Sequence, residues 1–304
     1  MTFQKKLGIA ATLLALVLPS RIAAQNASYG MVTHYLDNNL GSAMTNLGAG
    51  FVRLDFDWWA IETSQGQYDF SAKWNDVLQA QSRGLQVFAT LAYTPTWAGG
   101  GVDHHDPPTN INDWIDFVTT TAQEFNGYII YWGIWNEPDS TQFLTNPSYY
   151  PTLVSTARTA LKAVNSSNVV LGPEVSSGGV VNGYYSWFMN NYASLVDIVT
   201  VHYYNDGTNA TKWVDNFMDT RVLPYRNGRE VWMTETGRNY CDPSGQQNHY
   251  LGVLQNFQPR RSWWTKLFFF DLYEFPSCSD AILYPSYYER PAFYTYQSWI
   301  SSHP

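Results

Sequence analysis

Residues 128–140 read YIIYWGIWNEPDS and join an apolar run to an amide, a carboxylate and a proline. The apolar part, residues 130–135, has the length and the bulky side chains of a buried strand. Pro138 has no backbone N–H with which to extend a β-ladder, so we expect the strand to stop before it. Asn136 and Glu137 then lie at the carboxyl end of that strand.

Seven other short apolar runs follow the same plan, and amphipathic stretches separate them. Runs this apolar are typical of parallel strands that are buried on both faces. The predicted strands are 29–33, 51–54, 86–91, 130–135, 169–171, 198–202, 230–234 and 267–270. The predicted helices are 74–82, 114–124, 149–165, 213–218, 249–255 and 291–300. Eight strands that alternate with helices predict a single-domain α/β fold, the (β/α)8 TIM barrel.

An open, doubly wound parallel sheet is the alternative that this alternation leaves. Such a sheet usually carries a glycine-rich phosphate-binding turn after its first strand. Residues 30–39 read GMVTHYLDNN and contain no turn of that kind. We therefore predict the closed barrel.

Polar and titratable side chains stand at the end of nearly every predicted strand. In TIM barrels the active site lies at the carboxyl ends of the strands. The residues found there include His34, Arg53, Asn136, Glu137, Glu174, His202, Tyr204, Glu235 and Asp271. A fold held together by burial alone does not need such a collection, so we expect an active site at this rim.

Two glutamates at this rim, Glu137 and Glu235, are far apart in the sequence. Gly237 permits a sharp turn directly after the second of them. Two carboxyl groups across a cleft are the minimum set for cleaving a glycosidic bond, because one protonates the departing oxygen and the other attacks the anomeric carbon or activates water. A single glutamate at a strand end is more often a solvated rim residue, but this pair favours catalysis.

The motifs around the two glutamates resemble those of the retaining glycoside hydrolases of clan A, which carry catalytic carboxylates on strands 4 and 7. The resemblance spans nearly the whole chain after residue 24 and rests on WNEP at 135–138 and TETG at 234–237. Within the clan the sequence is most similar to family 39, through YTPTWA at 93–98, LGPE at 171–174 and RPAFYTYQSWI at 290–300. Family 5 is the next closest.

The resemblance implies a role for each matching residue. Glu137 would be the general acid/base and Glu235 the nucleophile. Asn136 would donate a hydrogen bond to the sugar 2-hydroxyl, a bond that strengthens in the transition state. Tyr204 would hydrogen-bond Glu235 and keep it ionised, and His202 would line the same subsite.

The electrostatic setting of the two carboxyl groups should differ. Arg53 would lie beneath Glu235 and lower its pKa through its opposite charge. The acid/base has to hold a proton before catalysis, so Glu137 should have a less cationic and more apolar setting. Trp132 and Trp135 would supply that setting, unless they belong to the barrel core.

Other polar and aromatic residues have open interpretations. Trp97 is a candidate for stacking on a sugar ring, and His34 is either a substrate contact or a core residue. Asp55 and Asp57 are interpreted as partners of Arg53. Two further glutamates are candidates to line the cleft, Glu174 and Glu274.

No cofactor or metal is predicted. DHHD at 103–106 looks like a metal cluster, but its spacing on a loop rich in glycine and proline fits no standard ligand template. A solvated loop or a substrate contact is the interpretation that we prefer for it.

Residues 1–24 are predicted to be a secretory signal peptide. Lys5 and Lys6 precede an apolar stretch, residues 8–18, that is too short to span a membrane. The catalytic domain would then be residues 25–304 of a secreted protein, which is extracellular or, in a bacterium, periplasmic.

Export permits a disulfide bond. The chain has two cysteines, Cys241 and Cys278, whose spacing fits no metal site, so we predict that they pair rather than remain as buried thiols. They follow the seventh and eighth strands, and a bond between these loops would brace one wall of the cleft.

Composition narrows the choice of partner. The net charge is −8 and no basic run follows the first residues, which argues against nucleic acid. No later stretch predicts a membrane helix. Aromatic residues make up 17% of the chain, and their flat rings suit the C–H faces of sugars. We therefore expect an oligo- or polysaccharide substrate, and a monomeric protein.

These inferences converge on a secreted retaining β-glycoside hydrolase that cleaves polysaccharide through a two-glutamate double displacement. Endo-action is favoured because a compact barrel without accessory domains tends to leave an open groove. The alternatives are an exo-acting β-xylosidase or β-glucosidase, a transglycosylase, and a barrel that binds sugar without cleaving it.

Overall fold

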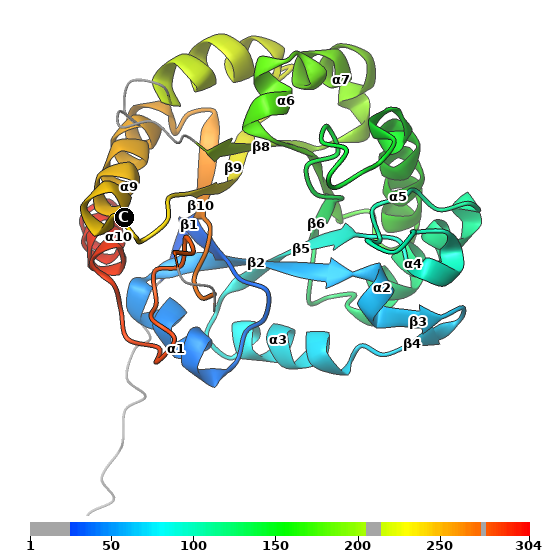
Figure 1. Ribbon diagram of the computed structural model, residues 1–304, viewed down its shortest axis with the longest axis horizontal. Coiled ribbons are helices and arrows are strands. Elements are labelled where there is room, and N and C mark those ends of the chain that lie inside the picture. The colour runs from blue at the N-terminus through cyan, green and yellow to red at the C-terminus, as the bar shows by residue number, and fades with distance from the viewer. Residues whose placement is uncertain (1–24, 205–213, 275–277) are drawn as a thin grey trace, which may run out of the picture.

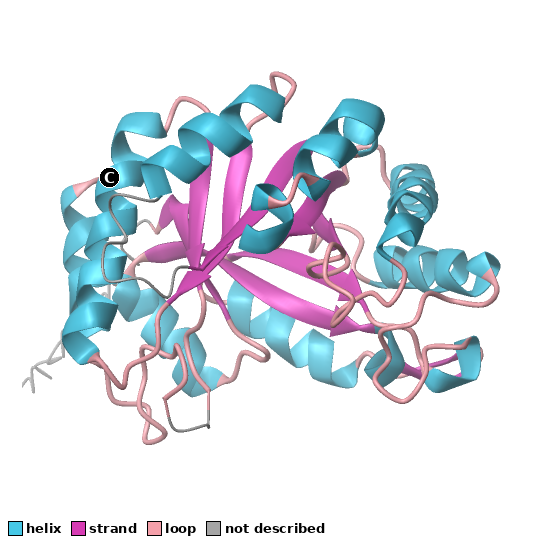
Figure 2. Ribbon diagram, turned by 45° about the horizontal axis from the view of Figure 1, so that its top comes forward, coloured by secondary structure: helices cyan, strands magenta, loops and turns pink. Residues whose placement is uncertain are grey.

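The computed structural model describes residues 25–204, 214–274 and 278–304, so the predicted signal peptide lies outside the described residues. Eight parallel strands close into a barrel that helices surround (Figure 1; Figure 2). In order around the barrel they are β1 (Asn26–Val32), β10 (Trp264–Phe269), β9 (Val231–Gly237), β8 (Ile198–Tyr204), β7 (Val169–Val175), β6 (Tyr131–Ile134), β5 (Gln86–Ala92) and β2 (Ala49–Asp57). Because β1 pairs with both β10 and β2, the sheet has no edge and the predicted (β/α)8 fold is confirmed.

The helices pack their apolar faces on the outside of the barrel. They are α1 (Asn38–Leu47), α3 (Ser71–Gln81), α4 (Ile111–Glu124), α5 (Tyr150–Val164), α6 (Ser177–Val181), α7 (Tyr184–Tyr192), α9 (Pro243–Phe257) and α10 (Pro291–Ser302). In α5 the buried residues Leu153, Ala157 and Leu161 recur every fourth position, the spacing of a single helix face. The short helix α2 (Trp58–Ile61) and a small hairpin, β3 (Glu62–Ser64) with β4 (Gln67–Tyr68), separate β2 from α3.

Aromatic side chains fill the interior of the barrel below its carboxyl end. Phe51, Trp232 and Phe268 belong to one buried cluster, with ring centroids 5.4 Å apart for the first two and 6.0 Å for the last two. The Lys266 ammonium lies 4.5 Å from the centroid of the Phe51 ring and donates to the carbonyl of Ala27. This aromatic cluster therefore closes the barrel at this end.

The end of β6 differs from the prediction. The strand stops at Ile134, well before Pro138, because the backbone turns into the left-handed region at Trp135 (φ 65°) and again at Glu137 (φ 40°). The Glu137 amide still donates to the carbonyl of Glu174 on β7, at 2.9 Å. Non-glycine residues adopt this conformation rarely, and such residues concentrate at functional sites.

Two further expectations can be compared with the fold. Cys241 and Cys278 form the predicted disulfide, with their Cα atoms 5.0 Å apart, and join the loops that follow β9 and β10. The predicted helix at 213–218 lies partly outside the described residues, because residue 213 is among those not described. No helix in the described part of the chain has the length and apolar character needed to cross a membrane.

Candidate active site

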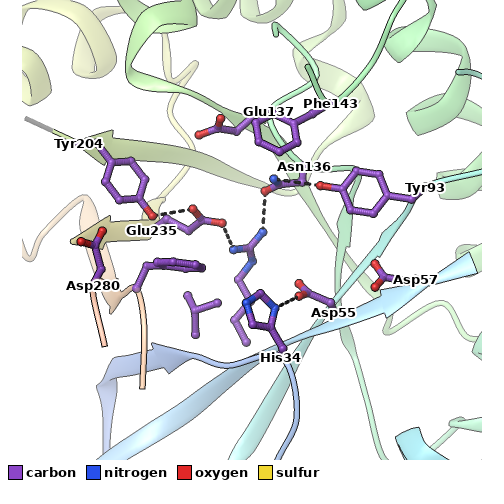
Figure 3. Close-up of a pocket in the computed structure, with 13 residues that line it drawn as sticks. His34, Asp55, Asp57, Tyr93, Asn136, Glu137, Phe143, Tyr204, Glu235 and Asp280 are labelled. Carbon is purple, nitrogen blue, oxygen red and sulfur yellow. Dashed lines mark hydrogen bonds and ion pairs between the residues drawn. The ribbon is translucent and has the colours of Figure 1, made fainter. Parts of the chain in front are cut away.

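A pocket of about 500 Å³ opens at the carboxyl ends of the strands, and both predicted catalytic glutamates line it (Figure 3). Glu137 follows β6 and Glu235 belongs to β9, so the closed barrel brings them together from opposite halves of the chain. One carboxyl oxygen of Glu137 lies within 4.8 Å of one carboxyl oxygen of Glu235. The two groups therefore face a single space.

Glu235 is held by donors on both of its oxygens. The Arg53 guanidinium contacts Oε1, and the Tyr204 hydroxyl donates to Oε2 at 2.8 Å. Burial alone would raise the pKa of Glu235, but the charges of His202 and Arg53, together with these hydrogen bonds, hold the pKa below its usual value. The side chain is therefore a carboxylate, as a nucleophile requires.

Arg53 reaches the site from β2 and is almost fully buried. Its Nε donates to Thr90 at 3.0 Å, and its Nη2 donates to the Oδ1 of Asn136 at 3.0 Å. Because Arg53 binds both Asn136 and Glu235, it fixes the distance between these two side chains. The Asn136 side-chain nitrogen points to the hydroxyl of Tyr93, at 3.3 Å.

His202 is fully buried and does not line the pocket, which corrects the expectation drawn from the sequence. Its Nδ1 is 2.9 Å from Oε1 of Glu137, and its Nε2 is 3.1 Å from Oε2 of Glu174. Burial alone would lower the pKa of His202, but the charge of Glu235 and the hydrogen bonds with Glu137 and Glu174 raise it to about 10. The ring is therefore an imidazolium with both N–H groups bound.

The setting of Glu137 is accordingly different from the one predicted. Trp132 and Trp135 are fully buried in the core and donate to Asn168 and to the Phe143 carbonyl, so neither lines the pocket. A cationic imidazolium contacts the carboxyl group of Glu137 instead. The positive charge of His202 is balanced by the neighbouring carboxylates of Glu174 and Glu235. The carboxyl group of Glu137 therefore has a charged setting and not the predicted apolar one.

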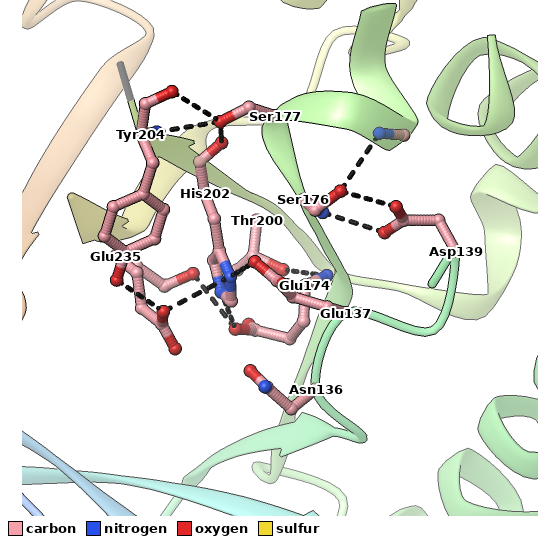
Figure 4. A network of polar contacts seen from close by, with 12 residues as sticks. Asn136, Glu137, Asp139, Glu174, Ser176, Ser177, Thr200, His202, Tyr204 and Glu235 are labelled. Atoms are coloured by element: carbon pink, nitrogen blue, oxygen red, sulfur yellow. Dashed lines mark hydrogen bonds and ion pairs between the residues drawn. The ribbon is translucent and has the colours of Figure 1, made fainter. Parts of the chain in front are cut away.

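The loop that carries Glu137 is also fixed from behind. The Ser176 amide and hydroxyl donate to the two oxygens of Asp139, at 2.8 and 2.5 Å (Figure 4). Ser176 caps α6, because its hydroxyl accepts from the amide of Gly179. The loop after β6 is therefore tied to the loop after β7.

The remaining predicted site residues have different positions. His34 lines the pocket, its side chain is 51% exposed, and its Nδ1 lies 2.7 Å from Oδ2 of Asp55. That hydrogen bond raises the pKa of His34 to about 9. Trp97 does not line the pocket, because its indole N–H donates to the Glu62 carbonyl and its ring packs edge-on against Trp58.

The structure also changes the interpretation of Asp55, Asp57 and Glu174. Asp55 pairs with His34, although the charge of Arg53 acts on it as well. Asp57 lines the pocket, and its carboxyl group has no hydrogen bond to another described residue. Glu174 is fully buried beneath the pocket instead of lining it.

Five residues that line the pocket were not predicted to belong to the site: Val32, Tyr93, Phe143, Phe270 and Asp280. Tyr93 directly follows β5 and has a φ of 68°, so its position after the strand was an available signal. Phe143 and Asp280 come from loops, and only the folded chain brings them to the pocket. Asp280 lies two residues beyond Cys278, so the disulfide places it.

The donor set does not favour a metal. Among the described residues, Glu137, His202 and Glu235 have one potential ligand atom each within 4.8 Å of one another. However, both nitrogens of His202 carry protons directed at carboxylates, and the Arg53 cation already contacts Glu235. The same carboxyl groups are better arranged for proton transfer and nucleophilic attack.

Solved structures with the same fold include several carbohydrate-active enzymes. A family 39 glycoside hydrolase from Bacteroides cellulosilyticus has a TM-score of 0.71 at 15% identity, over 90% of this chain and 63% of the other. A family 39 β-xylosidase from Caulobacter crescentus has a TM-score of 0.70 at 17% identity, over 91% of this chain and 71% of the other. An endo-β-1,4-glucanase from Xanthomonas axonopodis pv. citri has a TM-score of 0.66 at 14% identity, over 91% of this chain and 100% of the other. The chain thus spans less than two thirds of the first of these proteins.

The sequence itself places the chain in a family. Among curated proteins, none matches it. Residues 59–281, most of the described barrel, match the family described as the glycosyl hydrolase catalytic core. This match, the closed parallel barrel and the two facing glutamates agree with the resemblance to clan A that the motifs indicate. The chain belongs to the glycosyl hydrolase catalytic core family.

Proposed function

We propose that this protein is a secreted retaining β-glycosidase that cleaves polysaccharide within the chain, with Glu235 as nucleophile and Glu137 as acid/base. The separation of the two carboxyl groups, within 4.8 Å between oxygens, supports the proposal. Retaining enzymes place these groups about 5–5.5 Å apart, whereas inverting enzymes need roughly 6.5–9.5 Å to admit a water.

The reaction has two displacements. In the first, Glu137 gives its proton to the glycosidic oxygen while a Glu235 oxygen bonds to the anomeric carbon, and the leaving sugar departs as an alcohol. In the second, Glu137 takes a proton from water, the water oxygen bonds to the anomeric carbon, and Glu235 is released as a carboxylate. Atoms and charge balance across the cycle.

The charges around the pocket suit this cycle. Arg53 and His202 are cations, and Glu174 and Glu235 are their carboxylate partners, so these four groups sum to zero while Glu137 holds its proton. When the proton leaves, Glu235 has become a neutral ester and Glu137 a carboxylate, so the charge of these four groups and Glu137 together is still zero. The His202 Nδ1–H then donates to the new carboxylate at the site where charge develops.

The decisive experiment is covalent capture of the intermediate. A 2-deoxy-2-fluoro β-glycoside with a dinitrophenolate leaving group should add one sugar mass to wild-type protein at Glu235, and proton NMR should show β-configured product first. Glu235→Ala should lower turnover by roughly 10⁴-fold or more and prevent labelling. Glu289→Ala is the matched control, because Glu289 does not line the pocket.

Glu137→Ala should slow substrates with poor leaving groups far more than dinitrophenyl glycosides, which need no proton. Initial α-configured product would instead show inversion and reject the proposal. Product sizes from an oligosaccharide ladder distinguish endo-action from the exo-acting alternative, and added acceptor alcohols reveal transglycosylation. The mass of the exported protein tests removal of residues 1–24.

A further inference from the structure

Trp59 is an exposed indole at the edge of the catalytic pocket. It follows Asp57, which lines the pocket, and its amide donates to the carbonyl of Tyr93, another lining residue, at 3.2 Å. Its neighbour Trp58 is fully buried, whereas Trp59 is 40% exposed. The short helix α2 therefore directs one indole into the core and leaves the other on the rim.

The loop at 103–106, whose DHHD sequence resembled a metal cluster, supports this rim. The His104 ring stacks on Trp59 with centroids 4.8 Å apart and planes 7° from parallel. His104 is fixed in turn, because its Nδ1 lies 3.1 Å from the carbonyl of Thr94 and its own carbonyl accepts from the Thr94 amide. One face of the Trp59 indole is thus covered by a ring that cannot easily move.

The second histidine of the loop extends the same support to the pocket wall. The His105 ring lies 5.2 Å from that of Tyr93 and 5.9 Å from that of Phe143, and both of these residues line the pocket. The loop therefore backs three rim aromatics in succession, and only Trp59 lies outside the pocket. Its position continues the pocket wall along the surface.

We propose that Trp59, backed by His104, is a sugar-binding platform that stacks on a neutral ring of the polysaccharide at least one unit from the bond that is cleaved. The proposal rests on the proposed function and adds a subsite to it. A fixed indole offers a flat apolar face that matches the C–H face of a sugar, and its rigidity lowers the entropy lost on binding. A subsite beyond the pocket also favours cleavage within a chain.

Substrate length separates this role from a structural one. Trp59→Ala should lower kcat/KM on cello-, xylo- or laminari-oligosaccharides of five or six units by about tenfold more than on the matching 4-nitrophenyl monosaccharide. Trp59→Phe should recover part of the loss because it keeps a ring. His104→Ala should show the same dependence on length, more weakly. Trp187→Ala is the control, because Trp187 is 37% exposed but belongs to α7 on the outside of the barrel.

Binding without turnover keeps the two proposals distinguishable. Electrophoresis through gels that contain β-glucan or xylan should retard Glu235→Ala protein, and Trp59→Ala in the same background should abolish the retardation. If wild type cleaves nothing yet this loss is seen, the platform stands and the proposed function fails. If oligosaccharides of every length respond equally to Trp59→Ala, or not at all, the platform is rejected while the proposed function is untouched.

Discussion

Glu174 connects the two cations beneath the pocket although it never reaches the substrate. Its Oε2 lies 3.1 Å from His202 Nε2 and 3.5 Å from Arg53 Nη2, and it accepts from the Thr234 hydroxyl at 3.0 Å. Its main-chain carbonyl accepts from the amide of Glu137. One buried residue therefore fixes both the backbone of Glu137, the proposed acid/base, and the imidazolium that contacts its carboxyl group.

Glu174→Gln tests this arrangement at nearly constant volume. Without the carboxylate on Nε2, the pKa of His202 should fall from about 10, because only Glu137 and Glu235 remain to favour its charged form. Hydrolysis should then decline with rising pH at lower pH values than in wild type. The kcat profile from pH 4 to 10 measures this, and two superimposable profiles would refute the assignment.

The site was only partly predictable from the sequence. Strand-end position identified Glu137, Glu235, Arg53 and Asn136, because the barrel topology fixes where each strand delivers its last side chains. It did not say which strand-end residues face the pocket and which lie behind it. His202 lies only two positions before the lining residue Tyr204 on β8, and no residue of β7, Glu174 included, lines the pocket, so a single sequence does not reveal which strand-end side chains reach it.

At the scale of elements, the ends of the strands deviate most from regular structure. Tyr93, Trp135, Glu137 and Glu174 are all non-glycine residues with positive φ, and each lies at or just beyond the end of β5, β6 or β7. Such conformations cost roughly 1–3 kcal/mol each, so the surrounding contacts must hold them in place. The regular portions of the strands were predicted well because burial on both faces makes them continuously apolar. Helices α1 and α7 were missed, since α1 is rich in Asn and α7 is apolar on nearly every side.

The disulfide gives a prediction at this scale. Replacing Cys241 and Cys278 with Ser should lower the free energy of unfolding by roughly 3–4 kcal/mol, because the bond closes a loop of 37 residues in the unfolded chain. Turnover should fall as well, since Asp280 lies beside Cys278 and lines the pocket. Thermal melts with and without reductant provide the measurement. Two titratable thiols in denatured, unreduced protein would contradict the bond.

The whole molecule should be most stable in mildly acidic solution. Burial raises the pKa of Asp57 to about 7, of Asp271 to about 8 and of Asp280 to about 6, each from a usual value of 3.8. Ionisation of each aspartate therefore lowers the free energy of unfolding progressively as pH rises from about 4 through the pKa of the folded protein. His202 adds stability below its usual pKa of 6.5 and loses it as pH rises through about 10. Because the pKa of Glu235 is lowered in the folded protein, its stabilising contribution is lost as pH falls below about 4.5.

Asp271→Asn isolates one of these contributions. Both carboxyl oxygens of Asp271 are buried and have no hydrogen-bond partner among the described residues, so the ionised form is unfavourable. The variant should melt at a higher temperature than wild type at pH 8.5 and at nearly the same temperature at pH 4. The exposed Asp116→Asn should change neither melt. Equal shifts at both pH values would mean that the effect comes from packing.

The buried aromatic cluster of Phe51, Trp232 and Phe268 has a consequence for how substrate enters the barrel and product leaves it. Under the proposed function, a polysaccharide cannot pass through the barrel and has to bind across the open end at which the pocket lies, where it would be cut. Each product would then have to leave through the same open end of the barrel at which the next substrate molecule binds. Short products that linger there delay the next encounter, so turnover should slow as digestion proceeds.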